Sequence, residues 1–276
     1  MPEIPEMQAL AERLEAAVGG QRLTAVQPLQ FSALKTFSPE PGSLVERRLE
    51  GVGRRAKYLV FDFDDTTLLI HLSQGGRVDV ELPPKAGRTK LGVVRLTFED
   101  TAVLVKEFGT ERKAAWWVLP SGDEGPLGRL GPEPGSPGFS DFVRTSEDRR
   151  RVHTVLRDQR TVSGVGRGYT DDALHRAGLS PFASLASLSA EERERLLSSL
   201  EAVLAAGLEV ERRRTGGLPN KVGDHWVVHG RAGQSCPVCQ DPLHRVSYEA
   251  YEVTYCPTCQ TGGKVLADRR LSRLLK

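Results

Sequence analysis

The spacing of apolar residues predicts a helix close to the start of the chain. Leu10, Leu14 and Val18 recur at helical intervals between charged side chains, and Gly19 follows directly. This is the pattern of one amphipathic helix over 7–18 that ends at a glycine.

From about residue 23 to 119, short apolar runs of strand length replace the helical spacing. Two pairs of runs each flank two acidic residues, as strands flank the turn of a β-hairpin. The pairs are 58–63 with 67–72, and 93–98 with 101–105. Several such pairs with little helix between them favour an antiparallel β-sandwich.

Helical patterns return after a stretch rich in proline and glycine. One charged amphipathic helix is expected over 141–157 and a second over 169–177. Ser189 and Glu192 have the spacing of a capping box, in which each side chain bonds the other residue's backbone at the start of a long helix. This half of the chain is therefore expected to be helical.

All four cysteines of the chain lie near its end, as two Cys-x-x-Cys pairs. Cys236 and Cys239 form the first pair, and Cys256 and Cys259 form the second. The residues between the pairs, 246–255, read as a β-hairpin. This spacing predicts one tetrahedral zinc ion, and four sulfur ligands leave no open position, so the metal is structural. Disulfides are the alternative, and they are improbable in a cytosolic chain.

These patterns predict an α+β protein made of several consecutive domains and linkers. The predicted parts are a β-sandwich domain over 1–120, a linker over 121–138, a helical domain over 139–222, a zinc finger over 223–262 and a basic tail over 263–276.

Composition narrows the function only slightly. The 276 residues carry a net charge of +2 and no apolar run long enough to span a membrane. No signal segment opens the chain, which favours the cytoplasm. Basic runs occur at 149–151, 212–214 and 264–276. Such runs can contact phosphates, but a solvated surface is the commoner case.

The first residues carry the candidate chemistry. Removal of Met1 would leave a secondary amine on Pro2, which can attack an aldehyde-like carbon and form an imine. Glu3 and Glu6 lie close by in sequence and could transfer protons. On these residues alone a simple helix start is the commoner explanation, because proline and acidic residues suit the first turn of a helix.

A glycine-rich turn opens the helix expected over 169–177. Gly164 and Gly166 let backbone N–H groups approach an anion at a helix start, which is how such turns bind phosphate. An ordinary tight turn between two helices has the same sequence, so the turn alone does not decide between the two.

Taken together, these features resemble the formamidopyrimidine-DNA glycosylase and endonuclease VIII family, over nearly the whole chain. The segments that carry the resemblance are MPEIPE at 1–6, RRAKYL at 54–59, IHL at 70–72, LGPEP at 130–134, GVG at 164–166, HGRAG at 229–233 and YCPTCQ at 255–260.

The resemblance implies a bifunctional DNA glycosylase and AP lyase, a monomer that acts on damaged DNA in the cytoplasm, at the nucleoid. Pro2 would attack C1′ of a nucleotide flipped out of the helix, and Glu3 would move the protons. Glu6 resembles the family's second acid, and Lys57 the lysine that contacts phosphate beside the lesion. The other DNA-binding residues it implies are His71, Gln74, Lys106, Phe108, Gly164, Gly166, Arg167 and Tyr251.

The chain departs from the family's pattern at four of its DNA-contacting positions. Gln74 stands where one branch of the family has a methionine wedge. Glu107 replaces a phosphate-binding arginine and is expected to repel phosphate. Arg167 replaces an asparagine, and Tyr251 replaces an arginine of the zinc hairpin. These changes leave two alternatives open: the same chemistry on a bulky or single-stranded lesion, or a protein that binds damage without cleaving it.

Overall fold

The computed structural model describes residues 1–87, 89–218, 225–248 and 251–267. The chain forms two compact units. The first contains residues 1–129 together with 208–222, and the second contains 130–207 together with 223–276.

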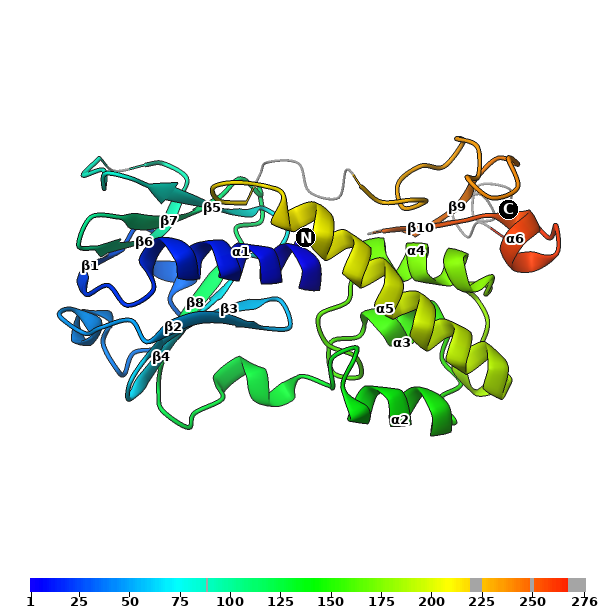
Figure 1. Ribbon diagram of the computed structural model, residues 1–276, viewed down its shortest axis with the longest axis horizontal. Helices are drawn as coiled ribbons and strands as arrows, with labels where there is room; N and C mark the ends of the chain where they lie inside the picture. The colour runs from blue at the N-terminus through cyan, green and yellow to red at the C-terminus, as the bar shows by residue number, and fades with distance from the viewer. Residues whose placement is uncertain (88, 219–224, 249–250, 268–276) are drawn as a thin grey trace. The chain divides into compact units, whose positions relative to one another are not determined.

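The first unit is built on two four-stranded sheets in which every strand pair is antiparallel (Figure 1). One sheet has the strand order β1-β6-β7-β5, and the other has the order β2-β3-β4-β8. The strands are β1 (Leu23–Pro28), β2 (Gly51–Arg55), β3 (Tyr58–Phe63), β4 (Thr66–His71), β5 (Gly76–Glu81), β6 (Gly92–Phe98), β7 (Ala102–Glu107) and β8 (Ala115–Pro120). Both expected hairpins, β3–β4 and β6–β7, are confirmed.

Helix α1 (Ile4–Val18) packs against β2 and β3 and shares one apolar core with the sandwich. It begins three residues before the expected start. Glu3 and Glu6 form a capping box, and Pro5 lies in the first turn, where its missing N–H is not needed. The buried residues Leu10, Leu14 and Val18 lie on the predicted apolar face.

The chain returns to the first unit late in its sequence. The Leu218 N–H donates to the Val78 carbonyl oxygen at 3.0 Å, and its side chain enters the sandwich core. The Arg13 guanidinium donates to the carbonyl oxygens of Glu211 and Gly216 at 2.9 and 2.8 Å. Strand β5 and helix α1 therefore anchor this segment.

The second unit is mainly helical, and one sequence expectation about it is wrong. The helix expected over 141–157 is two helices, α2 (Pro137–Thr145) and α3 (Val152–Arg157). The chain between them is extended because its backbone bonds to a distant segment. The Val152 N–H donates to the Ala183 carbonyl, and the Leu185 N–H donates to the Arg150 carbonyl. These long-range hydrogen bonds prevail over the local helical pattern.

The remaining helices follow the sequence more closely. Helix α4 (Arg167–Ala177) ends at Gly178 in the left-handed conformation, φ +65°. Helix α5 (Ala190–Arg212) begins with both hydrogen bonds of the predicted Ser189–Glu192 capping box. The hairpin near the end consists of β9 (His244–Ser247) and β10 (Glu252–Tyr255), and α6 (Pro257–Thr261) follows it. Short 3-10 turns occupy Phe31–Ala33, Pro41–Leu44, Gly125–Arg129 and Leu185–Ser187.

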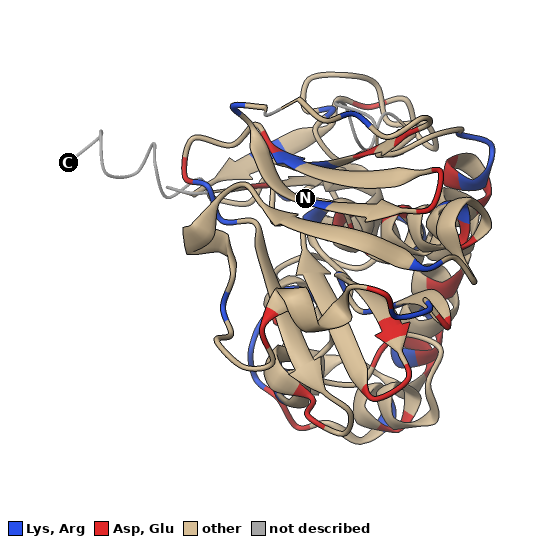
Figure 2. Ribbon diagram, turned by 90° about the vertical axis from the view of Figure 1, so that its left-hand side faces the viewer, with Lys and Arg blue, Asp and Glu red and all other residues tan. Residues whose placement is uncertain are grey.

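Charge is spread along the chain, and acidic and basic positions are interspersed on its strands and loops (Figure 2). Two arginines of the basic runs form ion pairs with carboxylates. Arg150 pairs with Asp148 and Asp158, and Arg212 pairs with Glu12. Across the described residues, no helix is both long and apolar enough to cross a bilayer.

Candidate catalytic centre and nucleic-acid interface

The amino-terminal residues form a buried, hydrogen-bonded cluster. Pro2 is buried, Glu3 is 3 % exposed and Glu6 is fully buried, whereas Met1 is 44 % exposed. The Glu3 N–H donates to the Glu6 carboxylate at 2.8 Å. Helix α1 therefore fixes both carboxyl groups beside the start of the chain.

This environment shifts two protonation equilibria. Burial, followed by the nearby charge of Glu3, raises the pKa of Glu6 to about 7. Burial also lowers the pKa of the α-amine carried here by Met1, and the positive charge of Lys57 lowers it further, against the opposing effect of Glu3. At neutral pH a larger share of this Met1 amine is therefore unprotonated.

Lys57 and His71 reach the same cluster from the sheet. Lys57 is 7 % exposed and lies on the tight β2–β3 turn, next to Ala56 with φ +51°. His71 ends β4 opposite Tyr58, and their ring centroids are 4.8 Å apart. Burial and the charge of Lys57 lower the pKa of His71 to about 4, so its imidazole is neutral at pH 7. Arg77, a residue that the sequence analysis missed, has a positive charge that also lowers the pKa of the α-amine. The available signal was its position near the start of β5, three residues after Gln74.

Two turns of the sandwich that carry predicted DNA contacts lie side by side. The Phe108 N–H donates to the Gly75 carbonyl at 2.9 Å, and a Cβ on Gly75 would lie 2.3 Å from the Gly109 nitrogen. Gln74 is exposed on one turn, and Phe108 is 48 % exposed on the other. The ammonium of Lys106 pairs with Asp79, so its charge is partly neutralised.

Glu107, which was expected to face and repel phosphate, points into the protein instead. Glu107 is 4 % exposed, and its two carboxylate oxygens accept the N–H groups of Lys113 and Ala114 at 2.9 and 2.8 Å. The side chain is turned inward and holds the following loop. An arginine at this position would lose both hydrogen bonds, so there is no basis for expecting it to strengthen DNA binding.

In the second unit, the Gly164–Gly166 turn is held by one amide side chain. The Gln159 Oε1 accepts the Gly164 N–H at 2.9 Å, and its Nε2 donates to the Val165 carbonyl at 2.7 Å. Gly164 has φ +88°, which favours glycine, and Gly166 caps α4, where Arg167 is the first residue. Because the Gly164 N–H is already used, the predicted anion contact by this group is not available in this conformation.

The four cysteines gather near one another, with a buried histidine beside them. The Sγ atoms of Cys236 and Cys259 are 3.8 Å apart, and those of Cys239 and Cys256 are 3.4 Å apart. Sulfurs around one tetrahedral zinc ion lie about 3.8 Å apart, given Zn–S bonds of about 2.3 Å. The arrangement fits the predicted structural zinc, which would tie the hairpin to α6.

The His175 Nε2 lies 3.2 Å from the Cys236 sulfur, and the histidine is 6 % exposed at the end of α4. Its nitrogen and the sulfurs of Cys236, Cys256 and Cys259 all lie within 4.8 Å of one another. Cys239 falls outside this group and approaches Cys256 most closely. We assign the histidine as a neighbour of the metal ligands and the four sulfurs as the ligands, because a thiolate accepts a hydrogen bond readily.

Two buried aspartates of α4, also missed from the sequence, attach this region to the helix. Asp172 accepts the N–H groups of residues 227, 228 and 229 at 2.7 to 3.1 Å. Asp171 is hydrogen-bonded to His153, His229 and the Thr254 N–H. These bonds keep the pKa of Asp171 low despite its burial. Adjacent acids within a short helix were the available signal, but their partners are distant in sequence.

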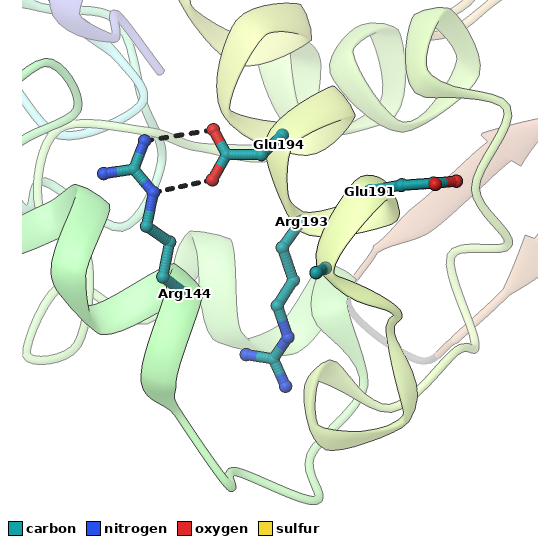
Figure 3. Close-up of a pocket in the computed structure, with 5 residues that line it drawn as sticks. Arg144, Glu191, Arg193 and Glu194 are labelled. Carbon is teal, nitrogen blue, oxygen red and sulfur yellow. Dashed lines mark hydrogen bonds and ion pairs between the residues drawn. The ribbon is translucent and has the colours of Figure 1, made fainter.

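A surface hollow elsewhere in the second unit is a structural joint and carries no catalytic chemistry. Arg144, Ala190, Glu191, Arg193 and Glu194 line it (Figure 3). Arg144 bonds both carboxylate oxygens of Glu194, and the Arg193 guanidinium donates to the carbonyl oxygens of Val143 and Ser146 at the end of α2. These charged groups are engaged in holding α2 to α5.

Comparison with known proteins gives matches along nearly the whole chain. Residues 1–115 match the formamidopyrimidine-DNA glycosylase N-terminal domain, and residues 130–216 match the H2TH domain of the same enzymes. The chain is 34 % identical to the formamidopyrimidine-DNA glycosylase of Thermus thermophilus, over 95 % of this chain and 100 % of the relative. It is also 44 % identical over 131 residues to an uncharacterized formamidopyrimidine-DNA glycosylase-like protein of Mycobacterium tuberculosis, covering 46 % of this chain and 80 % of that protein.

Solved structures show the same fold. The Lactococcus lactis Fpg in complex with DNA containing an abasic site superposes with a TM-score of 0.82 at 22 % identity, covering 94 % of this chain and 99 % of that chain. A mutant of the same protein bound to DNA containing Fapy-dG gives a TM-score of 0.82 at 23 % identity, over 94 % and 100 % of the two chains.

Proposed function

Because the chain belongs to the formamidopyrimidine-DNA glycosylase family, we propose that it excises oxidised bases from DNA and cleaves the resulting abasic site through a Schiff base on Pro2. The observation that carries this proposal is the buried cluster at the amino terminus. There Pro2, Glu3 and Glu6 are buried together, the Glu3 N–H donates to the Glu6 carboxylate, and Lys57 is buried close to the start of the chain.

Each residue of the cluster has a separate role in base removal. Once Met1 is removed, the nitrogen of Pro2 attacks C1′ of the flipped nucleotide, and the bond between C1′ and the base breaks. Glu3 supplies the proton that the departing base needs. Glu6 holds the Glu3 backbone in place through the 2.8 Å hydrogen bond, and its raised pKa keeps it partly protonated beside that acid.

Strand cleavage uses the same covalent link. Opening of the sugar leaves an iminium between Pro2 and C1′, which acidifies the C2′ protons. Loss of one C2′ proton expels the 3′ phosphate, and a second elimination expels the 5′ phosphate. Water then releases the sugar fragment and regenerates the amine. Lys57, which is buried close to the start of the chain, would bind a phosphate next to the lesion.

The second unit is assigned to DNA binding. We infer that Gly166 and Arg167 contact the backbone at the start of α4, and that Tyr251 contacts it from the zinc hairpin. In the first unit, Gln74 and Phe108 are proposed to fill the gap left by the flipped nucleotide, with His71 and Lys106 beside them. Zinc, when bound, orders the hairpin that carries Tyr251. The enzyme is expected to act on DNA in the cytoplasm, at the nucleoid.

Two observations favour a different lesion preference. Gln74 is exposed and polar where an apolar wedge is expected, and Lys106 is paired with Asp79. A glycosylase of the same chemistry that prefers a bulky or single-stranded lesion is therefore the second candidate.

Borohydride trapping on an oligonucleotide with an abasic site tests the proposal. Protein whose intact mass shows loss of Met1 should form a covalent adduct, and peptide mapping should place it on Pro2. Glu3→Gln should abolish excision of a damaged base far more than cleavage of a ready-made abasic site, because the latter has no base to protonate. An adduct on a lysine with Pro2 unmodified would refute the nucleophile. Absence of any adduct would favour a binding protein that does not cleave.

A further inference from the structure

Arg157 differs from Arg144 and Arg150 of the same unit. Arg144 pairs with Glu194, and Arg150 pairs with Asp148. In the described part of the chain, by contrast, no carboxylate lies within ion-pairing distance of the Arg157 guanidinium, which is only half-buried at the end of α3. A cation in this position keeps its charge available to an external anion.

An aromatic stack holds this guanidinium in place. Its central carbon lies 3.7 Å from the ring centroid of Tyr251. The Tyr251 ring stacks on Tyr248, with centroids 4.5 Å apart and planes inclined by 14°. The hydroxyl of Tyr248 in turn accepts a hydrogen bond from Arg151 at 2.8 Å. Stacking uses the face of a guanidinium and leaves its N–H edge able to donate to a planar or tetrahedral oxyanion.

The same residue is tied to the glycine turn before α4. The Gln159 Nε2 donates to the carbonyl oxygens of both Arg157 and Val165, at 3.0 and 2.7 Å. The end of α3 and the Gly164–Gly166 turn are therefore fixed to each other by one side chain. Since the Gly164 N–H is consumed by this amide, the turn lacks one of its expected donors, and Arg157 can replace it.

We propose that Arg157, held by its stack on Tyr251, binds a phosphate of the DNA backbone beside the Gly164–Arg167 turn. The inference rests on the proposed function and adds to it the residue that provides the charge on this surface. Tyr251 then acts as a positioning residue that orders the arginine, in addition to any contact of its own. A guanidinium ordered in advance binds phosphate with less loss of side-chain freedom.

The test is the salt dependence of binding to a duplex with a tetrahydrofuran abasic analogue, followed by fluorescence anisotropy between about 50 and 200 mM salt. Arg157→Ala should weaken binding roughly tenfold at low salt, as expected for one charge-assisted contact. It should also lower the slope of log Kd against log salt by about one. Tyr251→Leu should weaken binding with a smaller change in slope, because the charge remains but is less ordered.

Arg144→Ala is the matched control, because this exposed arginine of the same unit is paired with Glu194 and should leave affinity and slope unchanged. Zinc content and thermal unfolding report whether each variant is folded. If Arg157→Ala is not folded, the same binding measurements are made on Arg157→Gln, which keeps most of the length of the side chain but not its charge.

The outcomes separate the two proposals. If the wild type binds the duplex and forms the borohydride adduct while the folded Arg157 variant keeps the wild-type slope, the inference about Arg157 is overturned and the proposed function stands. If the wild type itself neither binds nor forms the adduct, both are overturned. A reduced slope in Arg157→Ala but not in Arg144→Ala supports the proposal.

Discussion

At the scale of single residues, burial determines how charged groups of this protein behave. Glu6 and Glu107 are both buried carboxylates, but they have different roles. Glu107 accepts two backbone N–H groups and holds a loop. Glu6 lies beside Glu3 with a pKa of about 7 and therefore changes charge within the neutral range.

The raised pKa of Glu6 predicts a loss of stability as the pH rises. The folded state holds this proton up to about pH 7, whereas the unfolded chain releases it near the ordinary value of 4.5. The stabilisation is therefore complete below about pH 4.5 and is lost as the pH rises through 7. The two pKa values correspond to an upper bound of about 3 kcal/mol.

Glu6→Gln should remove this component, so that thermal unfolding depends less on pH between 5 and 8 than in the wild type. Glu12→Gln is the control, because Glu12 is on the same helix, pairs with Arg212 and has a lowered pKa. If the Glu6→Gln and wild-type midpoints keep a constant separation over this range, Glu6 does not titrate there.

At the scale of elements, helix α4 joins the parts of the second unit. Its first residue follows the glycine turn, its middle carries Asp171 and Asp172, and its last turn places His175 against Cys236. This one helix thus holds the Gly164–Gly166 turn and the cysteine cluster in a fixed relation. Gly168 within it is required by packing, since a Cβ there would lie 2.3 Å from the Trp226 ring.

The contact between His175 and Cys236 predicts an effect on metal retention. His175→Ala removes a donor to the sulfur, and groups that support metal ligands in this way commonly change affinity by about 10- to 100-fold. Zinc should therefore pass faster to a chromogenic chelator. Arg176→Ala, the exposed neighbour, is the control. Equal release rates in the two variants would show that the histidine does not support the ligand.

At the scale of the whole molecule, the residues proposed for catalysis lie in the first unit, whereas those proposed to contact DNA lie in both units. The candidate nucleophile is in the first unit, which has a large apolar core. The zinc region has a small core of its own, formed by Val228, Cys236, Leu243 and Cys256. A core of that size needs a metal to be stable.

Removing one ligand should therefore affect the two units unequally. Cys256→Ser is expected to lose zinc and to bind DNA at least tenfold more weakly, while the far-UV signal of the sandwich is kept. The measurements are metal analysis, fluorescence anisotropy and circular dichroism. Val238→Ser, an exposed change between Cys236 and Cys239, is the control. A Cys256→Ser protein that still holds one zinc per chain would contradict the assigned ligand set.

The sequence by itself determined the features whose causes are local. The β3–β4 and β6–β7 hairpins, the glycine end of α4 and the four-cysteine cluster all follow from patterns a few residues long. The proximity of Pro2, Glu3 and Glu6 also followed from the sequence, because the three residues are neighbours along the chain.

The tertiary structure alone decided the features that depend on distant partners. The break between α2 and α3 depends on hydrogen bonds to residues 183–185, and Leu218 joins the sandwich through Val78. The inward direction of Glu107 and the stack of Arg157 on Tyr251 also depend on segments brought together by folding. Spacing along a chain reports which face a residue occupies, whereas the partner that satisfies a buried charge or an open hydrogen bond is selected by packing.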